Sequence, residues 1–404
     1  MKIFNRIIIL IAILAMAWGG PKLFRLVTDT STRTPFVYYS CVDKTFCQMT
    51  FSDSGIVRSN KHGKVYNESE FDSILPMFYY RQLLAESRMP DTIKGKAINM
   101  RFIRGNSFFF RYRPNSKYTP SVKLFPLFEA IPKRLKLELP EDVFRMNNGI
   151  EFIQPETNEL DVEKSKKYTS ILLKKGYQAP ARLVAGNPST RKSYDNGYFI
   201  VDKNYEVFHL KQLNNRPFIK KTNIPANLKV KHIKVTEYAS RAFYGFLWDK
   251  DNKMYLIHSQ DYELIPIPTP PFNLEQDNMV IMANPFYWNI SVINNAGKTC
   301  WAIDIDKQEK VDDITCLTPE NSKVKYGKWI FPFELRFLSG KDNYVKPRFT
   351  WNIYSAIPFN LILMLIFVFI QYRRTKRWHI EAAIWTLFTG IFGLIACLFL
   401  KNKS

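Results

Sequence analysis

The chain has 404 residues, of which 46% are hydrophobic and 23% are charged, so its composition excludes a disordered polar chain. It contains 32 Phe, 21 Tyr and 8 Trp but only 16 Gly, which argues against a glycine-rich nucleotide-binding α/β enzyme and favours β-sheets with large cross-strand side chains. The formal net charge is +22, and a mean hydropathy of −0.22 excludes a multi-span transporter, although some segments are apolar enough to enter a membrane.

The N-terminal segment, residues 1–24, has the pattern of a membrane anchor. Lys2 and Arg6 precede an apolar run from Ile7 to Trp18, which is short for a transmembrane span and also fits a signal peptide. We expect an uncleaved anchor, with a cleaved signal peptide as the alternative. Both interpretations place residues 30–350 outside the cytoplasm.

Four of the five cysteines form two pairs that are local in sequence. Cys41 and Cys47 flank a strand–turn–strand pattern, and so do Cys300 and Cys316. In an oxidising compartment this spacing predicts disulfides 41–47 and 300–316, with free cysteines as the alternative. Cys397 falls in an apolar segment and is expected to be a plain core residue. No Cys-x-x-Cys spacing occurs, so we expect no zinc site.

Between the apolar ends, alternating apolar residues flank a turn signal about every 47 residues, a pattern that is typical of repeated β-hairpins. The seven predicted turns lie near Asp43, Arg104, Pro155, Asp202, Asp249, Asn294 and Gly340.

This period, with two clear strands in each unit, predicts a mainly β fold, most simply a β-propeller of about seven blades. An irregular β-sandwich or a set of stacked sheets is the alternative. Two helical insertions are expected, one between Asn67 and Pro90 and one from Asp161 to Lys175. Closure of a propeller would place the strand Phe36–Cys41 next to the final unit at Phe333–Val345.

No catalytic motif stands out in this β region. Its four histidines, His62, His209, His232 and His258, are dispersed, and no nucleophile elbow, phosphate-binding loop or zinc motif occurs. We therefore expect no catalytic residues, no metal and no cofactor. The polar segment from Ala185 to Tyr198 is either a solvated loop between blades or the lining of a binding face.

Two further apolar segments, residues 353–372 and 380–400, are each long enough to cross a membrane as a helix. With the N-terminal anchor they predict three transmembrane helices. The basic connection at residues 373–379 is expected in the cytoplasm by the positive-inside rule. Its cations are Arg373, Arg374, Lys376 and Arg377. The tail, residues 401–404, would then lie outside.

The exported part is itself basic. Eight of the 58 Lys and Arg residues and one of the 36 Asp and Glu residues lie outside residues 22–350, which leaves 50 cations against 35 anions there. Export argues against a nucleic-acid partner. The excess charge fits a solvated surface near anionic lipid headgroups, or else an acidic partner or ligand.

Three segments resemble an uncharacterised family of bacterial proteins, a domain of unknown function. They are KSKKYTSILLKKGYQAPARLVAGNPSTRKSYDNGYFIVDKNYEVFHLK (residues 164–211), FYGFLWDKDNKMYLI (residues 243–257) and FPFELRF (residues 331–337). The resemblance implies a membrane-anchored envelope protein of the Bacteroidetes type, encoded beside ABC-transporter subunits. It implies no catalytic residues.

Two hypotheses follow. The first is a non-enzymatic accessory or sensor subunit of an ABC-type transport system, held in the bacterial inner membrane with a periplasmic β domain that binds a partner or ligand. Its partners would be membrane lipid and the permease or ATPase subunits. The second is a periplasmic hydrolase or lyase acting on glycans, which would require a pocket with two carboxylates, or a histidine and a carboxylate, about 5–9 Å apart.

Overall fold

The computed structural model describes residues 2–28, 34–52, 55–118, 122–132, 137–317, 322–339, 342, 344–378 and 380–400. It divides into two compact units, which are described separately below. The β unit comprises residues 34–317, and the membrane unit comprises residues 1–33 and 318–404. The predicted turn near Gly340, His379 and the tail at 401–404 lie outside the described residues.

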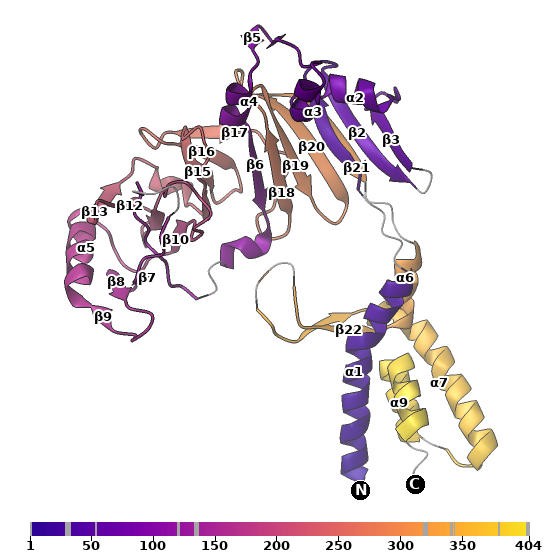
Figure 1. Ribbon diagram of the computed structural model, residues 1–404. Helices are drawn as coiled ribbons and strands as arrows, with labels where there is room; N and C mark the ends of the chain where they lie inside the picture. Colours follow the sequence, from indigo (N-terminus) through magenta and orange to yellow (C-terminus); the bar gives the residue numbers. More distant parts are fainter. Residues whose placement is uncertain are drawn as a thin grey trace. The chain divides into compact units, whose positions relative to one another are not determined.

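The β unit consists mainly of antiparallel sheets whose strands follow one another in chain order (Figure 1). Three of these sheets are built from consecutive strands alone. They are β1 (Phe36–Ser40), β2 (Thr45–Ser52) and β3 (Gly55–Asn60); then β10 (Leu183–Gly186), β11 (Tyr198–Val201), β12 (Val207–Leu213) and β13 (Arg216–Lys221); and β14 (His232–Val235), β15 (Phe243–Trp248), β16 (Met254–His258) and β17 (Leu264–Ile267).

The other sheets differ in size. A five-stranded sheet has the order β21 (Glu309–Leu317), β20 (Gly297–Asp304), β19 (Tyr287–Ile293), β18 (Asn278–Ala283) and β6 (Phe108–Tyr112). Smaller sheets are β7 (Val143–Met146), β8 (Ile150–Ile153) and β9 (Leu160–Asp161), and the pair β4 (Thr92–Ile93) and β5 (Lys96–Ala97).

Buried aromatic and aliphatic side chains join the sheets in series. Phe208 and Phe152 belong to one buried cluster between the β7–β9 and β10–β13 sheets, and Phe199 and Leu247 belong to the next cluster, between the β10–β13 and β14–β17 sheets. Further clusters join the β14–β17 sheet to the five-stranded sheet and that sheet to β1–β3. The core of the β unit is therefore a set of layers between adjacent sheets.

Five of the seven predicted hairpins are confirmed, with turns near Asp43, Pro155, Asp202, Asp249 and Asn294. The hairpin near Arg104 is wrong. Asn99 caps a helix there, α4 (Met100–Asn106), by accepting the Phe102 N–H at 2.8 Å. The strand that follows, β6, pairs instead with β18, so its partner is distant in sequence.

Both predicted helical insertions are confirmed. The first is broken around Pro76 into α2 (Glu68–Ile74), capped by Asn67, and α3 (Tyr80–Ala85). The second is α5 (Val162–Lys174), capped by Asp161 and followed by Gly176 with a φ of +91°. Both caps satisfy N–H groups that a helix start leaves without partners.

The two predicted disulfides are absent, and the structure has five free cysteines. Cys47 pairs with the middle of β1, whereas Cys41 lies beyond the end of that strand. Cys300 pairs with Ile314, so Cys316 is its diagonal neighbour. Diagonal positions are about 7–8 Å apart, whereas the Cα atoms of a disulfide are usually about 4.4–6.8 Å apart. Strand register therefore keeps both pairs apart.

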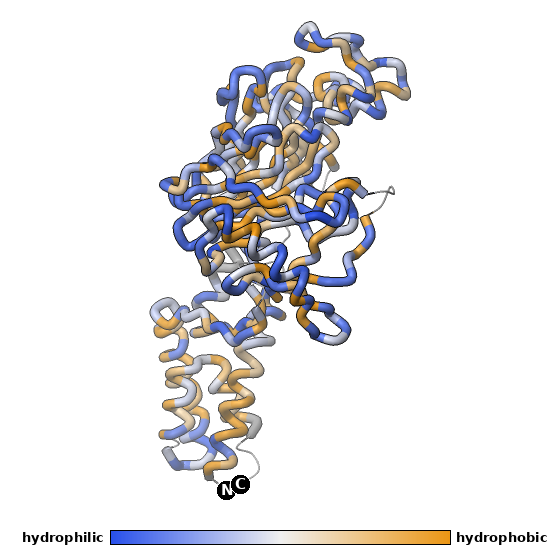
Figure 2. Tube along the Cα trace, turned by 90° about the vertical axis from the view of Figure 1, so that its left-hand side faces the viewer, coloured by the Kyte–Doolittle hydropathy of each residue, from blue (hydrophilic) through white to orange (hydrophobic). Residues whose placement is uncertain are grey.

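The membrane unit contains two helices that are long and apolar enough to cross a membrane, within Ile3–Thr28 and Ile353–Thr375. They belong to α1 (Lys2–Thr28) and α7 (Ile353–Thr375), and hydrophobic residues dominate both (Figure 2). The unit also contains α6 (Ser322–Ile330) and the paired strands β22 (Phe333–Arg336) and β23 (Arg348–Trp351). The predicted pairing of Phe36–Cys41 with the final hairpin is wrong, because β1 pairs with β2 and β22 pairs with β23.

The predicted third span is not one continuous helix. Residues 380–400 form α8 (Ile380–Thr389) and α9 (Ile391–Leu400), separated by Gly390 with a φ of +57°. Each has 10 residues, about 15 Å of helix, which is half of a bilayer core. A Cβ on Gly390 would lie 2.2 Å from Asn360 Oδ1, so α7 packs closely at the break. Four exposed cations lie in the last turn of α7 and directly after it: Arg373, Arg374, Lys376 and Arg377.

Candidate functional site

The β unit has a cleft of about 510 Å³ whose walls come from the β10–β13 and β14–β17 sheets and from two loops. We call it the Lys211–Arg241 cleft. It is lined by Ala130, Ile131, Pro132, Ser193, Tyr194, Asp195, Asn196, Lys211, Leu213, Phe218, Arg241, Tyr244 and Ser259.

Two cations of this cleft lie over aromatic rings. Lys211 Nζ is 4.5 Å from the centroid of the Tyr244 ring, and Arg241 Cζ is 4.4 Å from that of Tyr194. Burial lowers the pKa of Lys211 to about 8, and neighbouring carboxylates such as Asp195 counteract this only in part. The cleft thus presents a permanent guanidinium together with an ammonium that loses its charge just above neutral pH.

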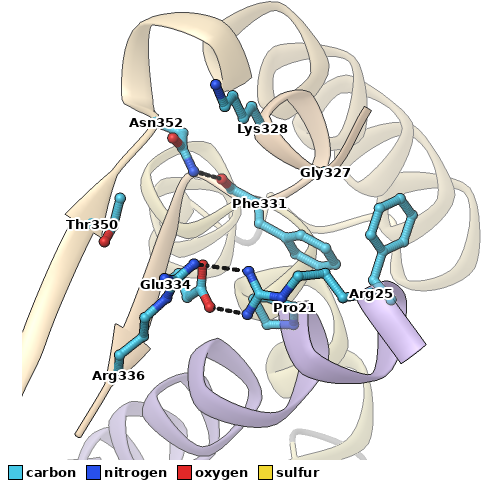
Figure 3. A pocket seen from close by; sticks show the side chains of 10 residues that line it. Pro21, Arg25, Gly327, Lys328, Phe331, Glu334, Arg336, Thr350 and Asn352 are labelled. Carbon is cyan, nitrogen blue, oxygen red and sulfur yellow. Dashed lines mark hydrogen bonds and ion pairs between the residues drawn. The ribbon is translucent and has the colours of Figure 1, made fainter. Parts of the chain in front are cut away.

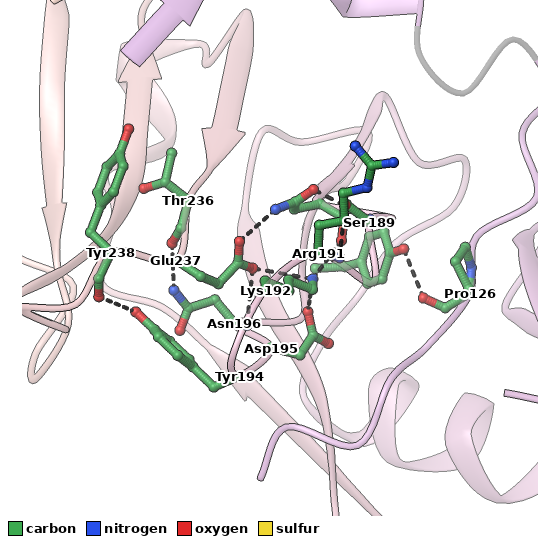
Figure 4. Close-up of polar contacts among 12 residues, drawn as sticks. Pro126, Ser189, Arg191, Lys192, Tyr194, Asp195, Asn196, Thr236, Glu237 and Tyr238 are labelled. Carbon is green, nitrogen blue, oxygen red and sulfur yellow. Dashed lines mark hydrogen bonds and ion pairs between the residues drawn. The ribbon is translucent and has the colours of Figure 1, made fainter. Parts of the chain in front are cut away.

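A buried ammonium holds the loop beside the cleft (Figure 4). Lys192 Nζ contacts Asp195 Oδ1 at 2.5 Å, Glu237 Oε1 at 3.3 Å and the backbone oxygen of Asn187 at 2.5 Å. The Lys192 side chain is 3% exposed and both carboxylates are 1% exposed. We call this the Lys192–Asp195–Glu237 triad. It links the loop before β11 to the segment after β14.

Asn196 extends the triad to the next strands. Its N–H donates to Glu237 Oε1 at 3.3 Å, and its side-chain amide donates to the Thr236 oxygen at 2.7 Å. Its own carbonyl lies 2.6 Å from His209 Nε2, which therefore carries the proton, while Nδ1 accepts from Tyr262 Oη at 3.0 Å. Burial lowers the pKa of His209 to about 3, so this histidine is a neutral structural group.

The triad brings two carboxylates close together without forming a catalytic pair. Asp195 and Glu237 contact the same ammonium, but Glu237 is not part of the cleft wall, and Lys192 lies between them. Burial raises the pKa of Asp195, and the charge of Lys192 opposes this. Asp195 Oδ2 is buried without a hydrogen-bond partner. One carboxylate of the cleft thus has an oxygen with unused hydrogen-bonding capacity.

The segment Ala185–Tyr198 is the part of this site that sequence reasoning identified. Ser193 to Asn196 line the cleft, and Tyr194 to Tyr198 are buried, so this end of the segment is not a solvated loop. Lys211, Arg241 and Glu237 were missed. Their only local signal is a charged residue within or next to an apolar strand.

The other residues singled out by sequence do not come together at this site. The histidines stay dispersed, and the described residues contain no group of three or more His, Cys, Asp or Glu side chains that could hold a metal ion. The four cysteines lie in or near the β1–β3 and five-stranded sheets, away from the cleft walls.

A family model described as a domain of unknown function, DUF4857, matches residues 36–303. The chain belongs to this family. The match confirms the resemblance and covers nearly all of the β unit, including the cleft and the triad. A search of curated proteins finds no match.

Among solved structures, the chain is similar to the β-propeller domain of Cps50 (Swd1) from Myceliophteria thermophila, with 8% identity and a TM-score of 0.25. That alignment covers 48% of this chain and 56% of the propeller domain, so the chain spans about half of that domain's length. The dihydro-heme d1 dehydrogenase NirN in complex with DHE matches with 7% identity, a TM-score of 0.12 and coverage of 64% and 87%. TM-scores this low support no conclusion about the fold or function of this chain.

Proposed function

We propose that this chain is a membrane-anchored, non-catalytic binding subunit of an ABC-type envelope transport system, and that its β unit binds an anionic ligand in the Lys211–Arg241 cleft. The proposal of an anionic ligand rests on one observation: two cations, Lys211 and Arg241, each lie over an aromatic ring in one cleft of about 510 Å³. Carboxylate and phosphate groups bind such cations.

The proposed location is the bacterial inner membrane, with the β unit in the periplasm. Two helices that could span a membrane and the exposed cations at the end of α7 support this topology. The transport partner rests on the family resemblance alone. Affinity purification of the detergent-solubilised full chain should recover a permease and an ATPase subunit of one ABC transporter. Recovery of neither would reject the transport role and leave the binding role to be tested separately.

We also propose a propeller-like arrangement of the β unit. Its support is that five sheets pack in series through shared cores, and that two of them are complete four-stranded antiparallel meanders. Electron microscopy of the full chain in nanodiscs would show whether these sheets surround a common axis.

The ligand proposal predicts a specific response to substitution and pH. Calorimetry on the full chain with citrate, phosphate and galacturonate as probes should detect binding of at least one anion. Lys211→Gln and Arg241→Gln should each weaken it about tenfold or more, the loss expected for one charge-assisted hydrogen bond. Lys250→Gln, an exposed turn residue, is the control with the same change of charge and should bind like the wild type.

Because the pKa of Lys211 is lowered to about 8, its ammonium is lost as the pH rises through that value, and anion binding should weaken there. Lys211→Arg should remove this pH dependence, because a guanidinium stays charged. If no probe binds, or if the Lys250 variant loses as much affinity as the cleft variants, the ligand proposal is wrong.

A glycan hydrolase or lyase is the alternative. Its support is that two carboxylates, Asp195 and Glu237, contact one ammonium beside the cleft. A glycosidase uses a pair of carboxylates about 5–9 Å apart. Against it, both side chains are almost fully buried and already bonded to Lys192. Turnover of an acidic glycan that Glu237→Gln abolishes would favour the enzyme over the binding subunit.

A further inference from the structure

The membrane unit has a small pocket beside the end of α1 that follows Pro21 (Figure 3). We call it the Arg25–Arg336 pocket. Its volume is about 130 Å³, the liquid volume of a few water molecules at about 30 Å³ each, which suits a phosphate better than a sugar. Its walls are Pro21, Phe24, Arg25, Gly327, Lys328, Phe331, Glu334, Arg336, Thr350 and Asn352.

Cations outnumber anions among these residues. Arg25, Lys328 and Arg336 face a single carboxylate, Glu334, whose side chain is 8% exposed. Arg25 Nη1 donates to Glu334 Oε2 at 3.0 Å, and Arg336 Nη2 donates to the same oxygen at 2.8 Å. Burial alone would raise the pKa of Glu334, but these two arginines hold it at about 2. The carboxylate is therefore ionised at neutral pH, and two positive charges remain in excess.

Arg336 is available to an additional anion. Its side chain is 50% exposed, and a guanidinium has five N–H donors, of which Glu334 occupies one nitrogen. Glu334 orients this guanidinium, because the carboxylate is itself fixed by Arg25 from the other side. The arrangement resembles a prepared phosphate clamp, in which planar bidentate donors are held in place before the ligand arrives.

The surroundings of the pocket match the boundary of a bilayer. Phe24 and Phe331 contact each other with ring centroids 5.5 Å apart. Trp329 and Trp351, from α6 and β23, are 62% and 60% exposed, and such exposed tryptophans are enriched where a membrane meets water. Leu26, in the last turns of α1, is 80% exposed and extends this apolar surface.

We propose that the Arg25–Arg336 pocket binds the phosphate of an anionic phospholipid headgroup, with the acyl chains lying along the exposed apolar side of α1. This inference rests on the membrane-spanning part of the proposed function and not on the ligand cleft. It accounts for charge, size and position together: a phosphate-sized pocket with two excess cations lies beside apolar surface at the end of a candidate span.

The test uses the full chain in detergent micelles supplemented with phosphatidylglycerol, with phosphatidylcholine or with soluble glycerol 1-phosphate, and measures thermal unfolding and lipid retention by native mass spectrometry. Phosphatidylglycerol should raise the unfolding temperature more than phosphatidylcholine does. The Lys328→Gln and Arg336→Gln variants should each retain about tenfold less phosphatidylglycerol. Lys346→Gln, an exposed lysine of the same unit outside the pocket, is the matched control.

Equal stabilisation by both lipids, or equal loss in the Lys346 variant, would overturn the proposal, and equal stabilisation by glycerol 1-phosphate would reassign the site to a soluble phosphate. If the Arg336→Gln variant does not fold, the Lys328→Gln variant decides the test. Among the described contacts no hydrogen bond joins Lys328 to Glu334, so its substitution leaves the ion pairs of Glu334 in place. A cysteine at Thr375 that resists an impermeant maleimide in spheroplasts would support the topology independently, so failure of the lipid site and failure of the anchor can be told apart.

Discussion

Replacing Lys192 by methionine is expected to destabilise the β unit by about 3–5 kcal/mol, because it leaves two carboxylates buried without their shared counter-charge. Asp195 and Glu237 are each 1% exposed, so solvent cannot replace the ammonium. Chemical denaturation of the full chain, monitored by tryptophan fluorescence, measures this change. The matched control is Lys96→Met, which breaks an ion pair to Asp306 whose partners are 46% and 57% exposed. That loss should be below about 1 kcal/mol.

The pH dependence of the Lys192 variant has a definite sign. Burial already raises the pKa of Asp195 above its ordinary value of 3.8, and Lys192 opposes that rise. Without the ammonium, the folded state binds more protons than the unfolded state over a wider range above pH 3.8. Stability must then increase as the pH falls through that range. A variant whose stability does not improve on mild acidification would contradict the buried triad.

Replacing Gly197 by alanine is the second change with a large expected effect. Gly197 has a φ of +69°, and a Cβ there would lie 2.1 Å from the backbone oxygen of Leu210 on β12. The left-handed conformation costs about 1–2 kcal/mol for a residue with a Cβ, and overpacking adds about 1–3 kcal/mol. We expect a loss of about 3 kcal/mol or more in the free energy of unfolding. Anion binding should fall as well, because Lys211 follows Leu210 directly.

Gly63→Ala separates the two causes. Gly63 also has a positive φ, +87°, but nothing lies within 4 Å of its Cβ position. Its substitution should therefore cost only the conformational part, about 1–2 kcal/mol, and should leave the cleft unchanged. Similar losses at both positions would show that the close approach of Gly197 to β12 does not limit stability.

Local features of the fold were predictable from the chain because each depends on neighbouring residues. Asp202 and Asp249 mark turns between apolar strands that are almost continuously buried, and Asp161 caps α5 through a contact three residues away. The apolar runs of α1 and α7 likewise carry their own signal, since a membrane span is defined by length and hydrophobicity along a single segment. The segment Ala185–Tyr198 could be recognised as a candidate binding segment because its turn and polar residues are also local in sequence.

Long-range pairing decided the rest. The strand register that separates Cys300 from Cys316, the pairing of β6 with β18, and the close approach of Asn360 to the helix break at Gly390 all depend on partners that no local pattern specifies. The site has the same origin. Lys192 and Glu237 are 45 residues apart, and Lys211 and Arg241 lie on different sheets or loops. These charged side chains come together only when the sheets pack. In the sequence, a single charged residue could simply be exposed to solvent, where water weakens its interactions. Only the tertiary structure shows that these charges are buried away from water, where their interactions become strong.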